Sequence, residues 1–210
     1  VQVVTSIPKE KRIIFIPDQH LGHYVKTQTH RDNMILWRGY CPTHRRILAD
    51  YIRKKKQLYP DALVVVHPEC TTDVVSIADQ VASTSGILKY CRESKGKTFT
   101  QPLLRNNRVH PLRAGDEPAL VQRAGCDLDS IATPHSGAGF IIGTEIGLIH
   151  RLKKESPDKT FIAASDLADC PNMKLNTLEK ILWSLEDMVY KITVPEDIAR
   201  LALKSIQRMI

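Results

Sequence analysis

A cysteine stands just ahead of an amphipathic run near the end of the chain. The stretch CPNMK at 170–174 directly precedes residues 175–186 and follows an apolar, strand-like segment. A loop in this place lets the sulfur of Cys170 point away from the core, and the helix behind it fixes the direction. Thiolate is the form of cysteine that binds metals. A single cysteine before a helix is more often structural, so a metal-binding interpretation needs support from elsewhere in the sequence.

Cys41 gives that support, because it stands in a second loop between an apolar run and a predicted helix. His44 follows three residues later and is expected to orient this loop or to cap its helix, and not to serve as a metal ligand. The other thiols differ in their surroundings. Cys70 directly follows a polar loop and Cys91 falls within a predicted helix, so we interpret both as buried or incidental thiols.

His67 and Glu69 form a second candidate for chemistry. Pro68 lies between them and stiffens the turn, so both side chains can project to one side of the preceding strand. A histidine and a carboxylate placed together can transfer protons or bind a metal. The alternative is a solvent-exposed loop pair, and the residues alone leave both interpretations open.

Ser83 and Thr84 open a predicted helix in the stretch STSG at 83–86. Free backbone N–H groups, hydroxyl donors and the positive end of a helix together favour a phosphate or carboxylate. Ordinary N-capping by a hydroxyl side chain explains the same residues without any ligand.

These candidates share one position relative to the predicted strands. Polar residues follow six apolar runs in succession, at 18–20, 40–41, 67–69, 83–86, 144–145 and 169–170. In open parallel α/β sheets, ligands bind outside the carboxyl ends of the strands. The repeated placement therefore predicts one shared active face.

Most of these apolar runs are continuous and do not alternate with polar residues, which is typical of parallel strands covered on both faces. Strands are predicted at 13–16, 34–37, 63–66, 80–82, 140–142 and 161–164. Helices are predicted between them at 43–58, 72–78, 87–93 and 146–154. This alternation predicts a doubly wound α/β fold.

Two helices are predicted after the last strand. Asn176 is a candidate cap for the first, with Glu179 as its reciprocal partner. The second begins at residues 194–197, with a proline at its first position and acidic residues in its first turn. Each carries an apolar stripe that is expected to be buried: Leu178, Ile181, Leu182, Leu185 and Val189 in the first, and Ile198, Leu201, Ala202, Ile206 and Met209 in the second.

Composition limits the classes of function. The 210 residues are 42% hydrophobic and carry a net charge of +7, but the basic residues cluster on predicted helices and aromatic residues are not interleaved with them. Base-stacking platforms for nucleic acid are therefore not expected. The five cysteines are widely spaced and odd in number, which favours reduced thiols and a cytoplasmic location. No apolar run reaches the length of a membrane span, so no membrane association is expected.

Several separated motifs resemble quinolinate synthase, the iron–sulfur enzyme of NAD biosynthesis, and occur in the order of that family. They read IIFIPDQHLGHYV, MILWRGYCPTH, VVVHPEC, ASTSGILKYCRES, IIGTEIGLIHRLKKE and DCPNMKLNTLEKILW. The resemblance covers most of residues 1–99 and about 140–210. It implies that the chain begins well inside the family's pattern. Residues 100–139 match nothing in it and are interpreted as a surface insertion of balanced charge.

The resemblance implies three similar doubly wound α/β domains about a pseudo-threefold axis in the full-length family, of which this chain would hold half to two-thirds. Residues 1–42 would end the second domain, and 43–190 would form the third, interrupted by 100–139. Residues 191–210 would form a helix that packs back on the fold.

The resemblance also implies an activity, a condensing and dehydrating transferase reaction. Iminoaspartate would combine with dihydroxyacetone phosphate to give quinolinate, with a [4Fe-4S] cluster as Lewis acid. The iminoaspartate would be supplied by L-aspartate oxidase or dehydrogenase. Cys41 and Cys170 match two of the family's three cluster cysteines, and the third would lie outside this chain. His67, Pro68, Glu69, Ser83 and Thr84 would line the substrate pocket, with Glu69 as general base or iron-side ligand and His67 holding the substrate.

Two alternatives stay open. The chain could be an inactive fragment that folds as an α/β domain. It could also be a phosphate-binding α/β module without a cluster, in which Cys41 and Cys170 are core thiols.

Overall fold

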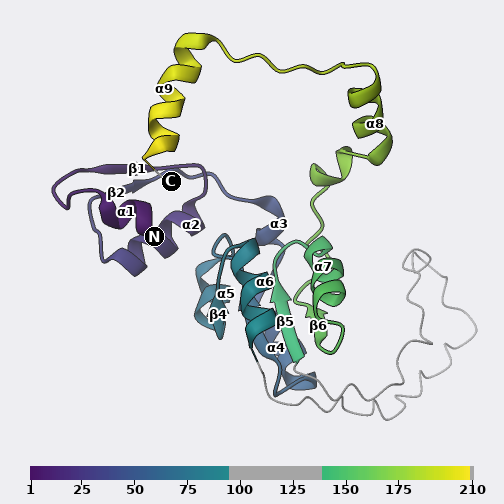
Figure 1. Ribbon diagram of the computed structural model, residues 1–210. Helices are drawn as coiled ribbons and strands as arrows, with labels where there is room; N and C mark the ends of the chain where they lie inside the picture. Colours follow the sequence, from purple (N-terminus) through teal and green to yellow (C-terminus); the bar gives the residue numbers. More distant parts are fainter. Residues whose placement is uncertain (95–138, 209–210) are drawn as a thin grey trace, which may run out of the picture.

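The computed structural model describes residues 1–94 and 139–208 (Figure 1). Strands and helices alternate along these ranges, and every strand pair is parallel, which confirms the predicted α/β class. The strands are β1 (Ile13–Phe15), β2 (Met34–Leu36), β3 (Leu63–Val66), β4 (Gln80–Val81), β5 (Gly139–Gly143) and β6 (Thr160–Ala163). The α-helices are α1 (Gln2–Ser6), α2 (Gln19–Thr29), α3 (Pro42–Arg45), α4 (Ala49–Leu58), α5 (Thr72–Ser76), α6 (Thr84–Glu93), α7 (Gly147–Glu155), α8 (Leu178–Glu186) and α9 (Glu196–Gln207), and Met173–Leu175 forms a 3-10 turn.

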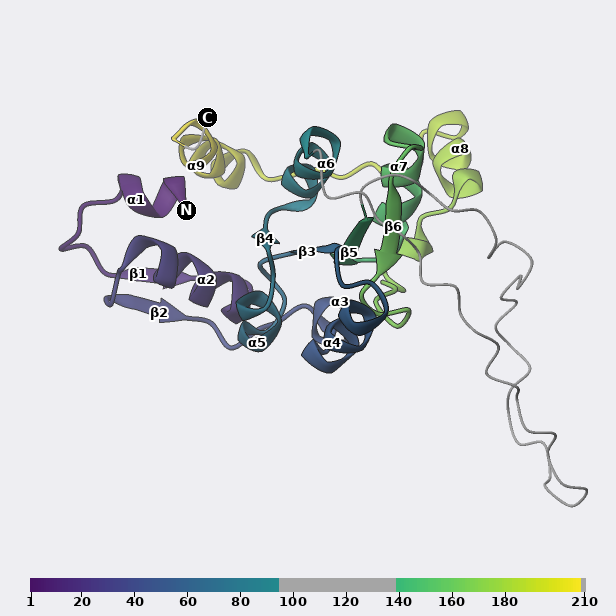
Figure 2. The same cartoon turned by 90° about the horizontal axis from the view of Figure 1, so that it is seen from below.

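The larger sheet has the order β4-β3-β5-β6 and lies between two layers of helices. Figure 2 shows α4 and α5 on one face and α6 and α7 on the other. Alternate residues of a strand point to opposite faces, so Val64 and Ile141 pack toward α4 and α5, whereas Val65 and Ile142 pack toward α6 and α7. Burial on both faces explains the uninterrupted apolar runs that the sequence shows.

A separate small sheet pairs β1 with β2. Helix α2 covers one of its faces, and Gly22 makes the close approach possible: a Cβ at this position would lie 2.8 Å from Cδ2 of Leu36 and 2.9 Å from Cδ1 of Phe15. Residues on the opposite face are exposed, namely Ile14, Ile16, Ile35 and Trp37.

The buried guanidinium of Arg31 fixes the N-terminal segment beside this sheet. Its nitrogens donate to the carbonyl oxygens of Val4, Ile7, Pro8 and Lys11 at 2.6–3.0 Å. A planar group with several donors in fixed directions suits this role, because one side chain satisfies four backbone acceptors.

Three expectations about helices need correction. The predicted helix 43–58 is two helices, because Leu48 is extended and Ile47 is fully buried at the break. Helix α2 was not predicted, since its sequence is largely polar. The cap of α8 is Thr177 and not Asn176: the Thr177 hydroxyl accepts from the backbone N–H of Lys180 at 3.4 Å.

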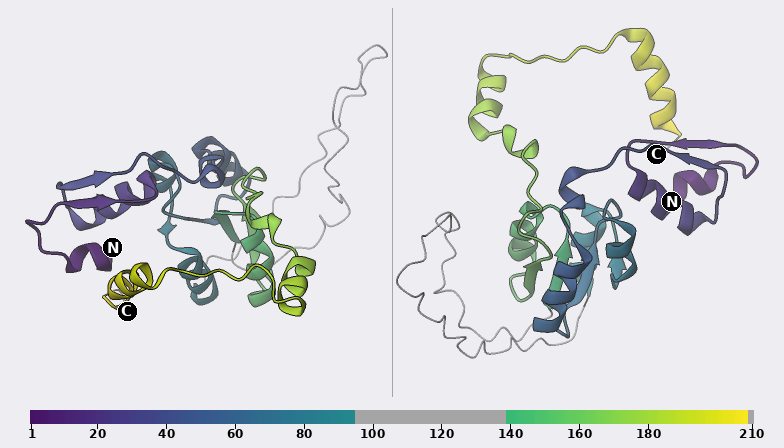
Figure 3. Two further views of the ribbon diagram at one scale, coloured as in Figure 1. Left: turned by 90° about the horizontal axis from the view of Figure 1, so that it is seen from above. Right: turned by 180° about the vertical axis from the view of Figure 1, so that it is seen from behind.

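The apolar stripes of α8 and α9 are exposed, contrary to the expected burial. No residue of α8 or α9 that the structure describes is buried. Figure 3 shows the two helices apart from each other, joined by an extended segment. Their amphipathic pattern is real, but within the described part of the chain neither stripe has a packing partner that buries it.

Two further expectations concern parts of the chain that are not described. The predicted insertion 100–139 lies outside the described residues except at Gly139, which begins β5, and Met209 also lies outside. None of the described helices is long and apolar enough to cross a membrane.

Burial predicts a contrast between two isoleucines. Ile141 is 0% exposed and Ile198 is 54% exposed. We expect Ile141→Ala to lower the free energy of unfolding by about 2–5 kcal/mol, because it leaves a cavity between the sheet and its helices. The matched change Ile198→Ala should cost less than about 0.5 kcal/mol. Urea unfolding followed by circular dichroism measures both, and equal losses would contradict the exposure of α9.

Candidate metal and substrate site

The buried carboxylate of Asp18 holds Cys41 in place. Asp18 is 3% exposed and caps α2, where its Oδ1 accepts from the backbone N–H of Leu21 at 2.8 Å. Its Oδ2 accepts from the backbone N–H of Cys41, also at 2.8 Å. Cys41 in turn is the residue that precedes α3, whose first position is Pro42. One side chain therefore connects the end of β1 to the cysteine loop.

His44, on α3, bridges two other strand ends. Its Nε2 lies 3.0 Å from Oγ1 of Thr144, which follows β5. Its Nδ1 lies 3.0 Å from Oε2 of Glu69, which follows β3, at ion-pair distance although the hydrogen bond is not well aligned. The ring also stacks on His67 with centroids 4.5 Å apart. His44 therefore orients Glu69 as well as its own loop, and it does not cap α3.

Cys41, His44 and Glu69 together form a potential metal site. One ligand atom from each, the sulfur, an imidazole nitrogen and a carboxylate oxygen, lie within 4.8 Å of one another. Sulfur and imidazole ligands suit iron and other transition metals. The sequence named Cys41 and Glu69 as candidates, and only the fold brings them to one point.

His67 and Glu69 differ in charge. Burial, and then the neighbouring His44, lower the pKa of His67. The contact with His44 lowers the pKa of Glu69 and outweighs the opposing effect of burial. At neutral pH, Glu69 is therefore an anion beside a neutral His67. Nδ1 of His67 accepts from the backbone N–H of Glu69 at 3.3 Å, which leaves its proton on Nε2.

Ser83 and Thr84 lie at the start of α6, after the edge strand β4. Ser83 caps the helix, with its hydroxyl oxygen accepting from the backbone N–H of Gly86 at 3.3 Å. Both residues are exposed. Because β4 runs parallel to β3, this helix start lies at the same sheet edge as His67 and Glu69.

Cys170 lies in the loop after β6, and its neighbours connect this loop to α3. The guanidinium of Arg46 donates to the carbonyl oxygen of Asp169 at 3.3 Å. The hydroxyl of Ser165 donates to the carbonyl oxygen of Arg46 at 3.1 Å. Since Arg46 ends the helix that begins after Cys41, both cysteine loops belong to one bonded region.

The four cysteines in the described residues are free thiols of two kinds. Cys70 and Cys91 are buried, and burial raises the pKa of each to about 12, so they remain protonated. Cys70 also donates to the carbonyl oxygen of Gly143 at 3.4 Å. Cys41 and Cys170 are partly exposed, and of these two only Cys41 belongs to the potential metal site within the described residues. Cys126 lies outside the described residues.

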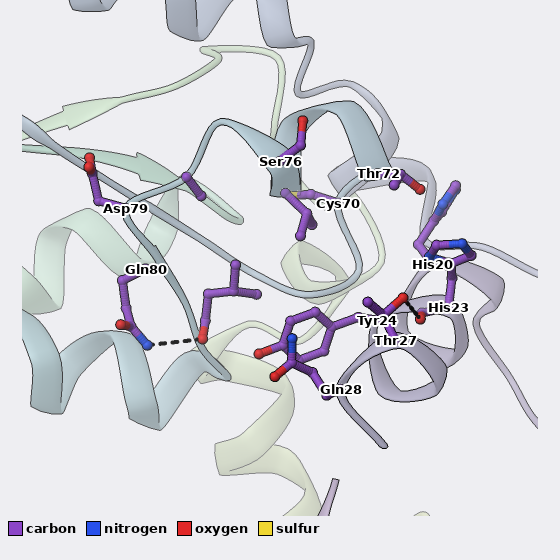
Figure 4. A pocket seen from close by; sticks show the side chains of 13 residues that line it. His20, His23, Tyr24, Thr27, Gln28, Cys70, Thr72, Ser76, Asp79 and Gln80 are labelled. Carbon is purple, nitrogen blue, oxygen red and sulfur yellow. Dashed lines mark hydrogen bonds between the residues drawn. The ribbon is translucent and has the colours of Figure 1, made fainter. Parts of the chain in front are cut away.

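A cavity of about 470 Å³ lies beside this site, between α2 and α5 (Figure 4). Its lining includes His20, His23, Tyr24, Ser76 and Asp79. Cys70 is at its border, but Cys41, His67, Glu69, Thr84 and Cys170 do not line it. His20, which the sequence grouped with the polar strand ends, lines this cavity and is not part of the Cys41, His44 and Glu69 group.

The model of the quinolinate synthetase A protein family matches residues 1–102 and 123–210. The chain belongs to the quinolinate synthetase A family. The match is interrupted only within the predicted insertion 100–139, and residues 100–102 and 123–139 are themselves matched, so the unmatched segment is shorter than the sequence suggested.

Curated relatives support this membership. The chain is 39% identical over 209 residues to quinolinate synthase of Thermodesulfovibrio yellowstonii, and 40% identical over 210 residues to that of Geotalea uraniireducens. Quinolinate synthase 1 of Methanosarcina acetivorans is 36% identical over 210 residues. All of this chain is covered in each case, and it spans 55% of the length of each relative.

The two kinds of thiol should differ in reactivity. In the native, metal-free chain we expect iodoacetamide to alkylate Cys41 and Cys170 at least about tenfold faster than Cys70 and Cys91, since thiolate is the reactive form. Mass spectrometry of the peptides gives the rate at each site, and the urea-unfolded chain is the control in which the rates should converge. Fast labelling of Cys70 or Cys91 in the folded chain would contradict their burial.

Proposed function

We propose that this chain forms part of a quinolinate synthase, which condenses iminoaspartate with dihydroxyacetone phosphate in NAD biosynthesis. The observation that carries the proposal is the convergence of Cys41, His44 and Glu69 at the carboxyl edge of the sheet in a member of this family. The relatives bear the name quinolinate synthase. The proposal also includes small-molecule substrates, a cytoplasmic setting, and L-aspartate oxidase or dehydrogenase as the source of the iminoaspartate.

Cys41 and Cys170 are proposed as ligands of a [4Fe-4S] cluster whose remaining protein ligand lies outside this chain. When bound, such a cluster supplies a Lewis acid at an iron without a protein ligand. The chain's own contribution is to present two partly exposed sulfurs from loops that Asp18 and Arg46 hold in place.

Glu69 is proposed as the general base. Its carboxylate is ionised at neutral pH, and its Oε2 is held 3.0 Å from His44, so it can accept a proton without first reorienting. His67 is proposed to hold the substrate. Because its Nδ1 accepts a backbone hydrogen bond, its Nε2–H is the group available to donate to a substrate oxygen.

The start of α6 is proposed as the anion-binding part of the site. The hydroxyl of Thr84 and the free N–H groups of the first turn can receive the phosphate or a carboxylate of the substrates. Ser83 contributes indirectly, since its hydroxyl caps the helix and orders that turn.

Iron content tests the cluster proposal. After anaerobic reconstitution with iron and sulfide, with a small thiol present to take the place of the ligand outside this chain, we expect about four irons per chain, as a [4Fe-4S] cluster requires. Cys41→Ser and Cys170→Ser should each lose most of this iron, while Cys91→Ser, a buried control, should keep it. Undiminished iron in both of the first two variants would overturn the assignment of these ligands.

Phosphate binding tests the role of α6. Thr84→Ala should weaken binding of inorganic phosphate roughly tenfold, because it removes one hydrogen bond to a charged group. The matched control Thr177→Ala, at the start of α8, should leave the affinity unchanged. Isothermal titration measures both. If Thr84→Ala weakens phosphate binding while the cysteine variants keep their iron content unchanged, a phosphate-binding module without a cluster is the better interpretation.

A further inference from the structure

Lys174 connects the Cys170 loop to the end of β5 through two carboxylates. Its Nζ lies 3.3 Å from Oε1 of Glu145 and 3.6 Å from Oδ1 of Asp169. Both of these oxygens are shielded from solvent and have no aligned hydrogen-bond donor. The ammonium group of Lys174 thus compensates the negative charges of both carboxylates, Glu145 and Asp169.

Glu145 is itself held rigidly. Its Oε2 accepts from the backbone N–H of Gly147 at 2.8 Å, at the beginning of α7. Gly147 leaves room for this arrangement, because a Cβ there would lie 2.7 Å from Oε2 of Glu145 and 3.3 Å from Nζ of Lys174. The side chain of Glu145 is only 13% exposed, so the anchor on the β5 side is mostly buried.

The loop closes on itself between Cys170 and Lys174. The backbone N–H of Lys174 donates to the carbonyl oxygen of Pro171 at 3.1 Å and approaches that of Cys170 at 3.4 Å. The Lys174 side chain contacts Asp169, the residue before the cysteine, while Arg46 donates to the Asp169 carbonyl oxygen. Cys170 therefore lies in a turn that is held on both sides.

We propose that Lys174 is a positioning residue for metal binding. Through Glu145 and Asp169 it holds the Cys170 loop in its metal-binding conformation before the metal arrives, an inference that rests on the proposed role of Cys170. A ligand held in place in advance loses less conformational freedom on binding, which increases affinity. Lys174 acts through the loop and contacts neither metal nor substrate.

Binding of Co²⁺ to the chain tests this inference, because thiolate–cobalt absorption reports the ligand sulfurs. Lys174→Met removes a positive charge near a cation site, so electrostatics alone predicts tighter Co²⁺ binding. Loss of the loop's anchor predicts weaker Co²⁺ binding. We expect the Co²⁺ affinity to fall about three- to fivefold, which corresponds to the free energy of a partly exposed ion pair. Lys174→Arg should restore most of the affinity.

A double-mutant cycle ties the effect to the cysteine. In a Cys170→Ser background, Lys174→Met should cause no further loss of Co²⁺ affinity. The control is Arg151→Met, which breaks the exposed ion pair of α7 between Nε of Arg151 and Oε1 of Glu155, 2.7 Å apart. This variant should leave the Co²⁺ affinity unchanged. Hydrogen exchange of the 169–175 peptide should increase in Lys174→Met, while the urea midpoint stays within error of the parent.

Three outcomes would overturn the inference: unchanged or tighter Co²⁺ binding in Lys174→Met, an equal effect in the Cys170→Ser background, or faster exchange throughout the fold. The reconstitution experiment is independent of these. If Cys170→Ser keeps its iron while Lys174→Met weakens Co²⁺ binding only when Cys170 is present, the loop inference stands and the cluster assignment fails. If Cys170→Ser loses iron and Lys174→Met has no effect on Co²⁺ binding, the cluster assignment stands and the loop inference fails.

Discussion

The bonds of Asp18 join the two halves of this structure. A buried carboxylate is costly unless its oxygens are satisfied, and here each oxygen accepts one short bond from a backbone N–H. One bond begins α2, which covers the small sheet, and the other fixes Cys41, which leads into the layers of the larger sheet. Without Asp18, the position of Cys41 relative to the small sheet and α2 would depend on a free loop.

From that fixed point, α3 places His44 between two strand ends. The larger sheet is parallel throughout, so the loops after β3 and β5 leave the same edge, and His44 contacts one residue from each. The contact with His44 also lowers the pKa of Glu69, whereas the pKa of His67 is lowered first by burial and then by His44. The orientation and the charge of Glu69 thus have one structural cause.

The thiols illustrate how burial separates residues of one type. Cys70 directly follows Glu69 in sequence, yet its side chain turns into the core and its proton is retained. Cys41 and Cys170 are far apart in sequence and both are partly exposed, in loops that Arg46 connects.

Much of the fold and several residues of the candidate site could be predicted from the sequence. The apolar runs predicted the strands correctly, but the expected burial on both faces holds for the central strands β3 and β5 and is wrong for β1 and β2, whose outer face is exposed. The motifs around Cys41, His67 and Cys170 identified the family, because local motifs persist in the sequence whatever lies between them. Asp18 is an N-cap signal for α2, but the largely polar sequence of this helix obscures its amphipathic pattern.

Other features were decided by contacts between distant residues. The break between α3 and α4 has no sequence marker such as proline, and it follows from burial of Ile47. The apolar stripes of α8 and α9 predicted buried faces, but a stripe records only what a helix can bury, and the described fold leaves both exposed. The sequence by itself determined the element types and the candidate ligands. Tertiary structure alone decided which thiols are accessible, which groups His44 orients and which cation holds the Cys170 loop, because each depends on atoms that the chain brings together only when folded.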